Sequence, residues 1–481
     1  MWMKTLEKLS RGSSAPSRKI GRLLIASLLV ASCLLLWNNF KTSFNQSRLL
    51  ASFRQSKSSP QPPLPHSCNA TTETIERYQL TRPVQFLRRE IIASRSSSDL
   101  KFSEPLDAPL FDYRSANLTA QLLGEQTLDA CSHPLTVPVP TPPAQVDASH
   151  IDFGVATTYD RLYESLDQFA HWAGNSNARI FALIEPHGGH HTMMNKAQSL
   201  GIHLHIVESD IEYNARYFSL LKLLEENALE ETEWSCIIDD DTFFLSMPAL
   251  VKRLDQYDSS KPLYIGGLSE SVAQIAVFGI MGFGGAGVFV SRPLLDQLSE
   301  VFAECQAMEG TGDKKISQCI YQHTSTKFID DQGLRQLDLM DDASGFFEAG
   351  REQPLSVHHW KSWYQADMIK LATISKICGD TCLLRQWRFS DDWILTNGYS
   401  IVKRSREIAP GTMERTWTYH NGAVLESYFH ALGPLEDIDP GKISYRMEDS
   451  IIEEDGRVRQ FYIHRDDVEG DRVIELVWRS E

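Results

Sequence analysis

From residue 150 onward, the hydrophobic residues form short apolar runs that are separated by amphipathic segments. The apolar runs predict strands at 151–157, 178–185, 202–208 and 234–239. Between them, apolar residues recur three and four positions apart, which predicts helices at 159–173, 191–201 and 214–230. Strands and helices that alternate at this spacing build parallel sheets. The pattern therefore predicts an α/β fold with a Rossmann-like, mostly parallel sheet flanked by helices.

The residues before and after this α/β part do not follow its alternation of strands and helices. Residues 41–148 are rich in Ser and Pro and lack sustained periodicity, which indicates an extended stem with a short helical stretch at 72–80. Residues 385–481 alternate like strands, and Asn397-Gly398 between two apolar runs is a strong hairpin signal. We expect a small β-rich appended domain at 385–481, and the α/β domain then covers 149–384.

The N-terminal region contains an apolar run without charges, residues 23–37, which reaches the length of a short membrane span when it is extended to 20–40. Six Lys and Arg precede it against one acid, so the positive-inside rule places residues 1–19 in the cytosol. A cleaved signal peptide has the same order of segments, but bulky residues follow the run where small ones would be needed. We therefore expect a signal anchor. Three N-glycosylation sequons follow it, at Asn45, Asn69 and Asn117.

The strand predicted at 234–239 leads into three consecutive carboxylates, Asp239, Asp240 and Asp241. Ligands of open α/β sheets bind at the carboxyl ends of strands, and three like charges there need a nearby cation. Carboxylate oxygens suit Mg²⁺ or Mn²⁺, which proteins often hold together with substrate phosphates. The triplet therefore favours a site for a divalent metal and a diphosphate. A phosphatase motif fails by one residue, an EF-hand loop lacks its Gly and Glu, and an acidic surface turn stays an alternative.

Charge and cysteine content narrow the classes of partner and compartment. The net charge of −16 over 481 residues argues against a nucleic-acid partner, which requires a basic face. Of the eight cysteines, Cys33 lies in the N-terminal apolar run, and Cys236 lies in the strand before the triplet, where a free thiol packs as a small hydrophobe. The disulfides that we expect in an oxidising compartment are Cys305–Cys319, Cys378–Cys382 and Cys68–Cys131.

Five segments, taken in their order and spacing, resemble the Fringe-like glycosyltransferases of family 31. They are GVATTYDRL at 154–162, IIDDDTFF at 237–244, GFGGAGVFVSRPL at 282–294, TGDKKISQCI at 311–320 and LSVHHW at 355–360. The resemblance implies a GT-A fold, a UDP-sugar donor, Mn²⁺ or Mg²⁺, and inverting transfer to a hydroxyl of a glycan or glycoprotein acceptor. It also implies a single-pass type II protein of the Golgi membrane with a lumenal catalytic body.

The resemblance assigns roles to the acidic triplet and to LSVHHW. Asp241 corresponds to the direct metal ligand, and Asp239 and Asp240 would support it or hold the ribose. His358 resembles the distal metal ligand of the family, and His359 is the alternative.

The nucleotide is expected near Thr157 and Arg161, because they end the first strand and open its helix. The alternative for Thr157 is that it only caps this helix. The glycine-rich run contains Gly284 and Gly285, which we expect at the substrate, because a turn without side chains lets the backbone approach a sugar closely. Plain loop flexibility explains the same run equally well.

Inverting transfer needs a carboxylate that takes the acceptor's proton, and Asp313 is the candidate. The family usually has two adjacent acids at this place, whereas here Lys314 follows. Asp330 or Asp331 would be the substitutes. The departure also leaves two other functions open: a lumenal sugar-binding protein without turnover on a GT-A scaffold, and a metal-dependent phosphoesterase.

Overall fold

The computed structural model describes residues 72–81, 84–111, 131–408, 411–418 and 432–481. All of them belong to one compact unit, His66–Glu481. The expected cytosolic tail at 1–19, the anchor at 20–40, the three sequons and the Cys68 side of a disulfide lie outside the described residues. Among the helices that are described, none combines the length and the apolar character that a membrane span needs.

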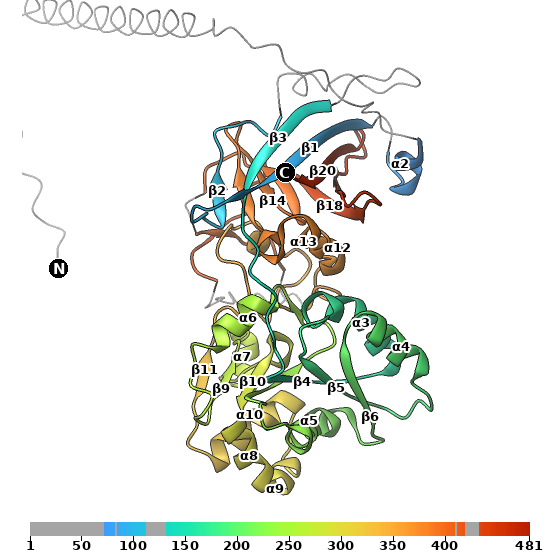
Figure 1. Cartoon of the computed structure of the whole chain (residues 1–481). Coiled ribbons are helices and arrows are strands. Elements are labelled where there is room, and N and C mark those ends of the chain that lie inside the picture. The colour runs from blue at the N-terminus through green and yellow to red at the C-terminus, as the bar shows by residue number, and fades with distance from the viewer. Residues whose placement is uncertain (1–71, 82–83, 112–130, 409–410, 419–431) are drawn as a thin grey trace, which may run out of the picture. The chain divides into compact units, whose positions relative to one another are not determined.

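A seven-stranded sheet forms the centre of the α/β part (Figure 1). Its strands, in spatial order, are β11 (Phe328–Asp330), β9 (Tyr264–Gly266), β10 (Val288–Ser291), β7 (Trp234–Ile238), β4 (Ile151–Thr157), β5 (Arg179–Ile184) and β6 (His203–Glu208). The four strands predicted from the first apolar runs pair in parallel. Strand β10 runs antiparallel to both of its neighbours. The sheet is therefore mixed, and its four-stranded half has the predicted parallel character.

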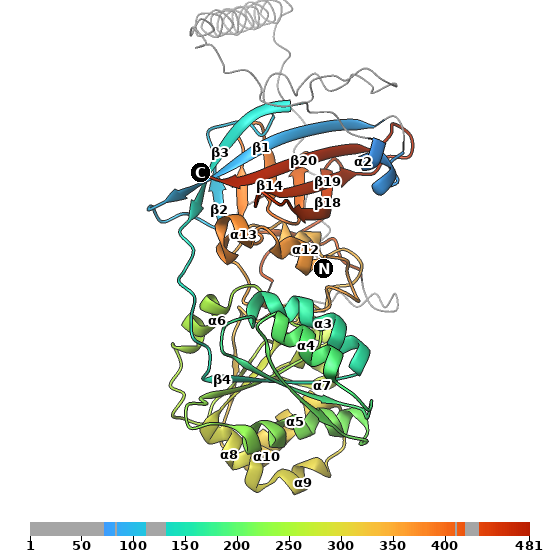
Figure 2. The ribbon, with the colours of Figure 1, turned by 45° about the vertical axis from the view of Figure 1, so that its right-hand side comes forward.

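Helices cover both faces of this sheet (Figure 2). One face carries α3 (Tyr159–Trp172) and α4 (His191–Ser199), and the other carries α5 (Tyr213–Asn227), α8 (Arg292–Glu300) and α10 (Gly312–His323). Strand β4 is buried along its whole length because it lies between two strands and two helical layers. Helix α3 turns a regular apolar stripe to the core, made of Leu162, Leu166, Phe169 and Trp172. The short α6 (Met247–Leu254) follows the acidic triplet.

A second sheet of nine strands corrects the expected stem. Strand β1 (Gln85–Ser96) pairs in parallel with both β3 (Cys131–Pro140) and the C-terminal β20 (Arg472–Ser480). The prediction of an extended stem over 41–148 is therefore wrong for these residues. Prolines in β3 concealed the strand, and they are tolerated because β3 lies at the edge of the sheet.

The remaining strands of this sheet come mostly from the C-terminal part, as the alternation at 385–481 predicts. They are β2 (Ser103–Pro105), β13 (Gln386–Arg388), β14 (Trp393–Thr396), β15 (Ser400–Lys403), β18 (Ile443–Ile452) and β19 (Val458–His464). The hairpin predicted at Asn397-Gly398 joins β14 to β15. One apolar cluster contains Phe243 and Val357 of the α/β part together with Trp387 and Trp478 of this sheet, so the two parts share a core.

Two of the expected disulfides are present. Cys305 in α9 (Phe302–Gln306) is bonded to Cys319 in α10, and Cys378 is bonded to Cys382. Among the described cysteines, Cys236 is a free and buried thiol, as expected. The Cys305–Cys319 disulfide therefore holds α9 against α10, the helix that begins beside the acidic triplet.

Candidate functional site

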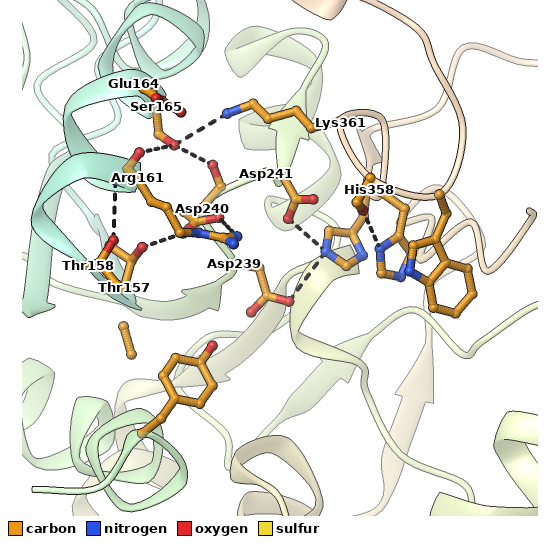
Figure 3. Close-up of a pocket in the computed structure, with 15 residues that line it drawn as sticks. Thr157, Thr158, Arg161, Glu164, Ser165, Asp239, Asp240, Asp241, His358 and Lys361 are labelled. Atoms are coloured by element: carbon orange, nitrogen blue, oxygen red, sulfur yellow. Dashed lines mark hydrogen bonds and ion pairs between the residues drawn. The ribbon is translucent and has the colours of Figure 1, made fainter. Parts of the chain in front are cut away.

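A cavity of about 600 Å³ lies where strands β4 and β7 end (Figure 3). Its walls come from the end of β4 and the first turns of α3, from the acidic triplet, from the start of α5, and from residues 358–363. This is the carboxyl edge of the parallel strands, where α/β sheets bind ligands. The structure thus brings six of the predicted site residues to one cavity, and these are Thr157, Arg161, Asp239, Asp240, Asp241 and His358. The predicted Gly284, Gly285 and Asp313 are not among the residues that line it.

Asp240 is held by the protein itself. Its carboxylate accepts hydrogen bonds from Arg161, with Nε at 2.6 Å, and from the hydroxyl of Thr157. Its backbone carbonyl accepts from Ser165 Oγ at 2.7 Å and from Gln168 Nε2 at 2.6 Å. These bonds fix the middle residue of the triplet and leave its carboxylate committed to Arg161. The prediction that Asp240 holds a ribose is not needed to explain its position.

Thr157 does not cap α3. The capping residue is Thr158, whose hydroxyl accepts from the backbone N–H of Arg161 at 3.3 Å. Thr157 is the last residue of β4, and its side chain turns instead to Asp240 (Figure 3). The simpler reading of Thr157 as a cap is therefore wrong.

The two outer residues of the triplet converge on one histidine (Figure 3). His358 Nε2 lies 2.9 Å from Asp241 Oδ1 and 3.4 Å from Asp239 Oδ2. Burial acts against a charge on His358, but Asp241 and Asp239 outweigh it and raise the pKa of His358 to about 10. Burial alone would raise the pKa of Asp241, but the charge of His358 lowers it. The carboxylates of Asp239 and Asp241 thus stabilise a positive charge at the place where they meet the imidazole of His358.

This arrangement fits a divalent cation. One oxygen of Asp241 and one ring nitrogen each of His358 and His359 lie within 4.8 Å of one another. Carboxylate oxygens with an imidazole are a donor set that Mn²⁺ accepts, and Mg²⁺ is compatible with the oxygens. His358 Nδ1 is buried and has no hydrogen-bond partner among the described residues. Its other nitrogen is the one that faces the carboxylates.

His359, the alternative ligand, faces a different group. Its Nε2 lies 3.1 Å from Asp338 Oδ1, and its ring stacks on Trp363 with centroids 4.1 Å apart. A φ of 60° places His359 in the left-handed region, which few residues other than glycine adopt. This backbone conformation lets His359 face Asp338 while His358 faces Asp241. His358 is therefore the better placed of the two to meet the acidic triplet.

The two predicted glycines make room for side chains of the protein. A Cβ on Gly285 would lie 2.1 Å from His358 Nδ1, and a Cβ on Gly284 would lie 1.7 Å from the hydroxyl of Tyr217. Both distances are far below any real contact, so a side chain at either position would force His358 or Tyr217 to move. The close approach that we expected from these glycines is thus made to His358 and Tyr217, and contact with substrate stays a prediction.

Asp313, the predicted base, lies at the start of α10, beside the triplet. Its carboxylate accepts from the backbone N–H of Lys314 at 2.8 Å and from that of Gly284 at 3.5 Å. Burial and then the negative charge of Asp239 raise the pKa of Asp313. Neither Asp313 nor the two alternatives is among the residues that line the cavity. Asp331 is bound by Arg253 and by the Tyr257 hydroxyl at 2.8 Å, and Asp330 accepts from the backbone N–H of Leu268 at 3.1 Å.

Sequence reasoning missed several residues of the site. Tyr213 opens α5 and lines the cavity, and Lys361 and Trp363 follow the two histidines. Tyr213 follows the third parallel strand, so the rule that found Thr157 applies equally to it. Nothing in the sequence pattern marked Lys361, which reaches Ser165 Oγ at 3.4 Å across the cavity.

Comparisons with known proteins give short and distant matches. Residues 274–367 match the family model described as "Protein of unknown function, DUF604". Human chondroitin sulfate synthase 3 is 27% identical over 130 residues, and the mouse protein is 27% identical over 128 residues. These stretches cover 25% of this chain and 14% of each relative, so the chain spans a small part of their length. The sequence matches confirm the resemblance to the Fringe-like glycosyltransferases.

Among solved structures, the chain is similar to glycosyltransferases at low identity. The mannosyltransferase PcManGT from Pyrobaculum calidifontis, in complex with GDP-Man and Mn²⁺, is 13% identical, with 38% of this chain and 55% of that chain covered and a TM-score of 0.28. Mouse xyloside xylosyltransferase 1 is 10% identical, with 45% and 98% covered and a TM-score of 0.27.

Proposed function

We propose that the protein is a metal-dependent, inverting glycosyltransferase of the GT-A type that moves a sugar from a UDP-sugar to a hydroxyl of a glycan or glycoprotein. The observation that carries this proposal is the convergence of Asp239, Asp241 and His358 at one edge of a parallel sheet, inside a cavity of about 600 Å³. An acidic surface turn would leave its carboxylates in solvent, whereas Asp240 and Asp241 are buried.

Asp241 and His358, with Asp239, would hold Mn²⁺ or Mg²⁺. The ion would stabilise the negative charge that develops on the diphosphate as the sugar leaves. Arg161 and Lys361 also line the cavity, and they add positive charge where the phosphates would bind. Burial lowers the pKa of Lys361, so its ammonium lies in a partly water-excluded site where its charge acts more strongly.

Asp313 is the group that would accept the proton of the acceptor hydroxyl. A raised pKa improves a carboxylate as a proton acceptor near neutral pH. Lys314 follows in place of the second acid of the family pattern, but its Nζ donates to the backbone carbonyl of Val277 at 3.3 Å and lies over the Phe278 ring. The Lys314 ammonium is thus directed to the helix at Val272–Phe278, and among the described residues no lysine side chain pairs with the Asp313 carboxylate, to which Lys314 donates only its backbone N–H.

Hydrolysis of a panel of UDP-sugars by the chain from His66 onward tests the proposal. We expect turnover with one donor in the presence of Mn²⁺, and loss of about 10²-fold or more in Asp241→Asn and in Asp313→Asn. The matched control is Asp296→Asn, because Asp296 is an exposed helix residue paired with Arg292. Equal Mn²⁺ and UDP affinities in the wild type and Asp241→Asn would refute the metal site.

The departure at Lys314 favours one second candidate, a sugar-binding protein on the same scaffold without turnover. This candidate predicts that UDP and Mn²⁺ bind with normal affinity while no donor is hydrolysed or transferred. The same panel therefore separates the two functions. Release of phosphate from simple monoesters would instead indicate a phosphoesterase.

The proposed location is the Golgi membrane, in single-pass type II topology with a lumenal catalytic body. The apolar run at 20–40 and the basic residues before it support this proposal. The disulfides Cys305–Cys319 and Cys378–Cys382 are consistent with an oxidising compartment. Protease protection of the C-terminal part in sealed Golgi vesicles tests the topology, and digestion without detergent would contradict it.

A further inference from the structure

A second and larger cavity, of about 1390 Å³, lies between the nine-stranded sheet and the α/β part. Its walls come from residues 101–103 at β2, from residues between 332 and 354, from residues between 384 and 408 and at 411–413, and from Arg253 of α6. It shares no lining residue with the cavity at the acidic triplet. Typical small-ligand pockets have about 300–1,000 Å³, so this cavity has room for several linked sugar rings.

The lining of this cavity has an excess of basic side chains in an acidic chain. Seven Lys or Arg and four Asp or Glu line it, although the whole chain has a net charge of −16. Of the four acids, Glu348 is buried and paired with Lys442 at 3.1 Å, and the other three are exposed to solvent. Water screens exposed carboxylates strongly. The basic groups therefore determine what the cavity attracts.

Two of the arginines are available to a ligand. Arg388 projects from β13, is exposed, and makes no ion pair or side-chain hydrogen bond with any described residue. Arg351 donates to the backbone carbonyl of Leu432 and has no carboxylate partner in the described part of the chain. Burial, and then repulsion from Arg351, lower the pKa of Arg335, which lies in the same wall, whereas Glu270 acts in the opposite direction. An anion between Arg335 and Arg351 would relieve the repulsion between these two arginines.

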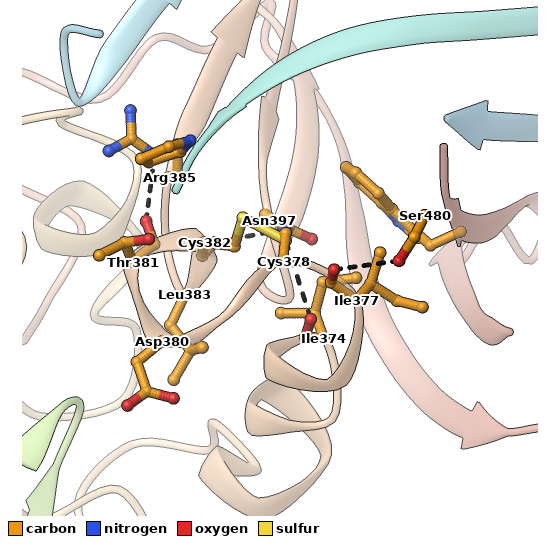
Figure 4. The surroundings of a disulfide bond; sticks show 12 residues. Ile374, Ile377, Cys378, Asp380, Thr381, Cys382, Leu383, Arg385, Asn397 and Ser480 are labelled. Carbon is orange, nitrogen blue, oxygen red and sulfur yellow. Dashed lines mark hydrogen bonds between the residues drawn. A yellow bond between two sulfur atoms is a disulfide. The ribbon is translucent and has the colours of Figure 1, made fainter. Parts of the chain in front are cut away.

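Arg385, three residues before Arg388 in the chain, is held by hydrogen bonds to two other segments, one of which Figure 4 shows. Arg385 donates to the backbone carbonyl of Thr381 at 3.0 Å, inside the loop that the Cys378–Cys382 disulfide closes. The same guanidinium donates to the carbonyl of Lys101 at 2.7 Å. These contacts join two of the segments that form the cavity. A preformed wall binds a ligand at a lower entropic cost than a mobile one.

We propose that this cavity binds an acidic oligosaccharide, one that carries carboxylate or sulfate groups. Guanidinium groups pair with carboxylate and sulfate through two parallel hydrogen bonds. Aromatic rings in the lining supply flat apolar surfaces on which the C–H faces of sugar rings pack: Phe346 and Trp393 both line the cavity and are half-buried. The site is separate from the proposed transfer reaction and needs neither nucleotide nor metal.

Calorimetric titration of the full-length chain, without nucleotide or divalent metal, tests the site with three probes of equal length. They are a hyaluronan hexasaccharide, a heparin hexasaccharide and neutral chitohexaose. We expect at least one acidic probe to bind about 10-fold or more tightly than chitohexaose, with affinity that falls as salt rises. The hyaluronan and heparin arms show whether carboxylate or sulfate is preferred.

Variants then locate the binding. Arg388→Gln and Arg351→Gln should each weaken the acidic probe by about 10-fold. Arg457→Gln is the matched control, because Arg457 is an exposed arginine of the β18–β19 hairpin paired with its own neighbour Asp455. It should bind as the wild type does, and thermal melting confirms that each variant is folded. Asp241→Asn should also bind the probe unchanged, which separates this site from the proposed catalytic cavity.

Three results would overturn the inference. They are equal affinity for chitohexaose and the acidic probes, unchanged binding in the Arg388→Gln Arg351→Gln double variant, and loss of binding in Asp241→Asn.

Discussion

Gly285→Ala should disturb the candidate metal site while leaving every proposed ligand residue in the sequence unchanged. The new Cβ would lie 2.1 Å from His358 Nδ1 and 2.2 Å from its Cε1, so the imidazole has to move by about 1 Å or more to reach an ordinary contact. His358 is buried, and overpacking at such positions costs about 1–3 kcal/mol. Its Nε2 lies 2.9 Å from Asp241, and this geometry would be lost. We expect Mn²⁺ affinity to fall by about 10–100-fold, the usual effect of disturbing the support of a ligand.

Thermal melting and a Mn²⁺ titration followed by electron paramagnetic resonance measure the two effects. Gly189→Ala is the matched control, because a Cβ at Gly189 meets no atom within 4 Å and should leave both quantities unchanged. Unaltered Mn²⁺ affinity in Gly285→Ala, with a melting temperature equal to that of the wild type, would refute the packing of His358 against this glycine.

Three further predictions concern charge. Burial raises the pKa of Glu270 from 4.5 to about 7, so the stability that its proton provides is present below about pH 4.5 and is lost as the pH rises through 7. Glu270→Gln should therefore be more stable than the wild type by up to about 3 kcal/mol at pH 8, and urea denaturation curves of the two proteins that differ equally at pH 4 and pH 8 would contradict this. Arg179→Met leaves the buried Asp152 without its partner at 2.6 Å and should cost about 3 kcal/mol in urea denaturation. Arg292→Met, which breaks a pair with the exposed Asp296, should cost under about 0.5 kcal/mol, and equal costs would count against the burial argument. If Asp313 is the base, the acidic limb of the transfer rate lies above the ordinary Asp range because burial raises its pKa, and a rate that is flat down to pH 4 would exclude it.

The parts of the site that the sequence predicts are those that follow from strand ends. Thr157, Asp239, Asp240 and Asp241 end or follow apolar runs, and parallel pairing of β4 with β7 brings them together. His358 was found only through the resemblance, because it meets the triplet across 117 residues of chain and β12 (Ser356–Val357) is too short to give a pattern. What no pattern could give is the internal pairing of Asp240 with Arg161, since the sequence shows three equal acids.

The predicted stem failed for a related reason. Strand β1 is stabilised by β20, and its contacts, such as Arg479 Nε with Glu90 Oε1 at 2.6 Å, join residues nearly 400 positions apart. Periodicity reports only local burial, and a strand such as β1, whose outer positions carry Arg, Glu and Ser, gives a weak local signal. The same long-range pairing places residues 101–103 beside β13 and so builds the second cavity. A region read as a spacer is therefore part of the folded body, and it contributes a wall to the site that we infer for acidic sugars.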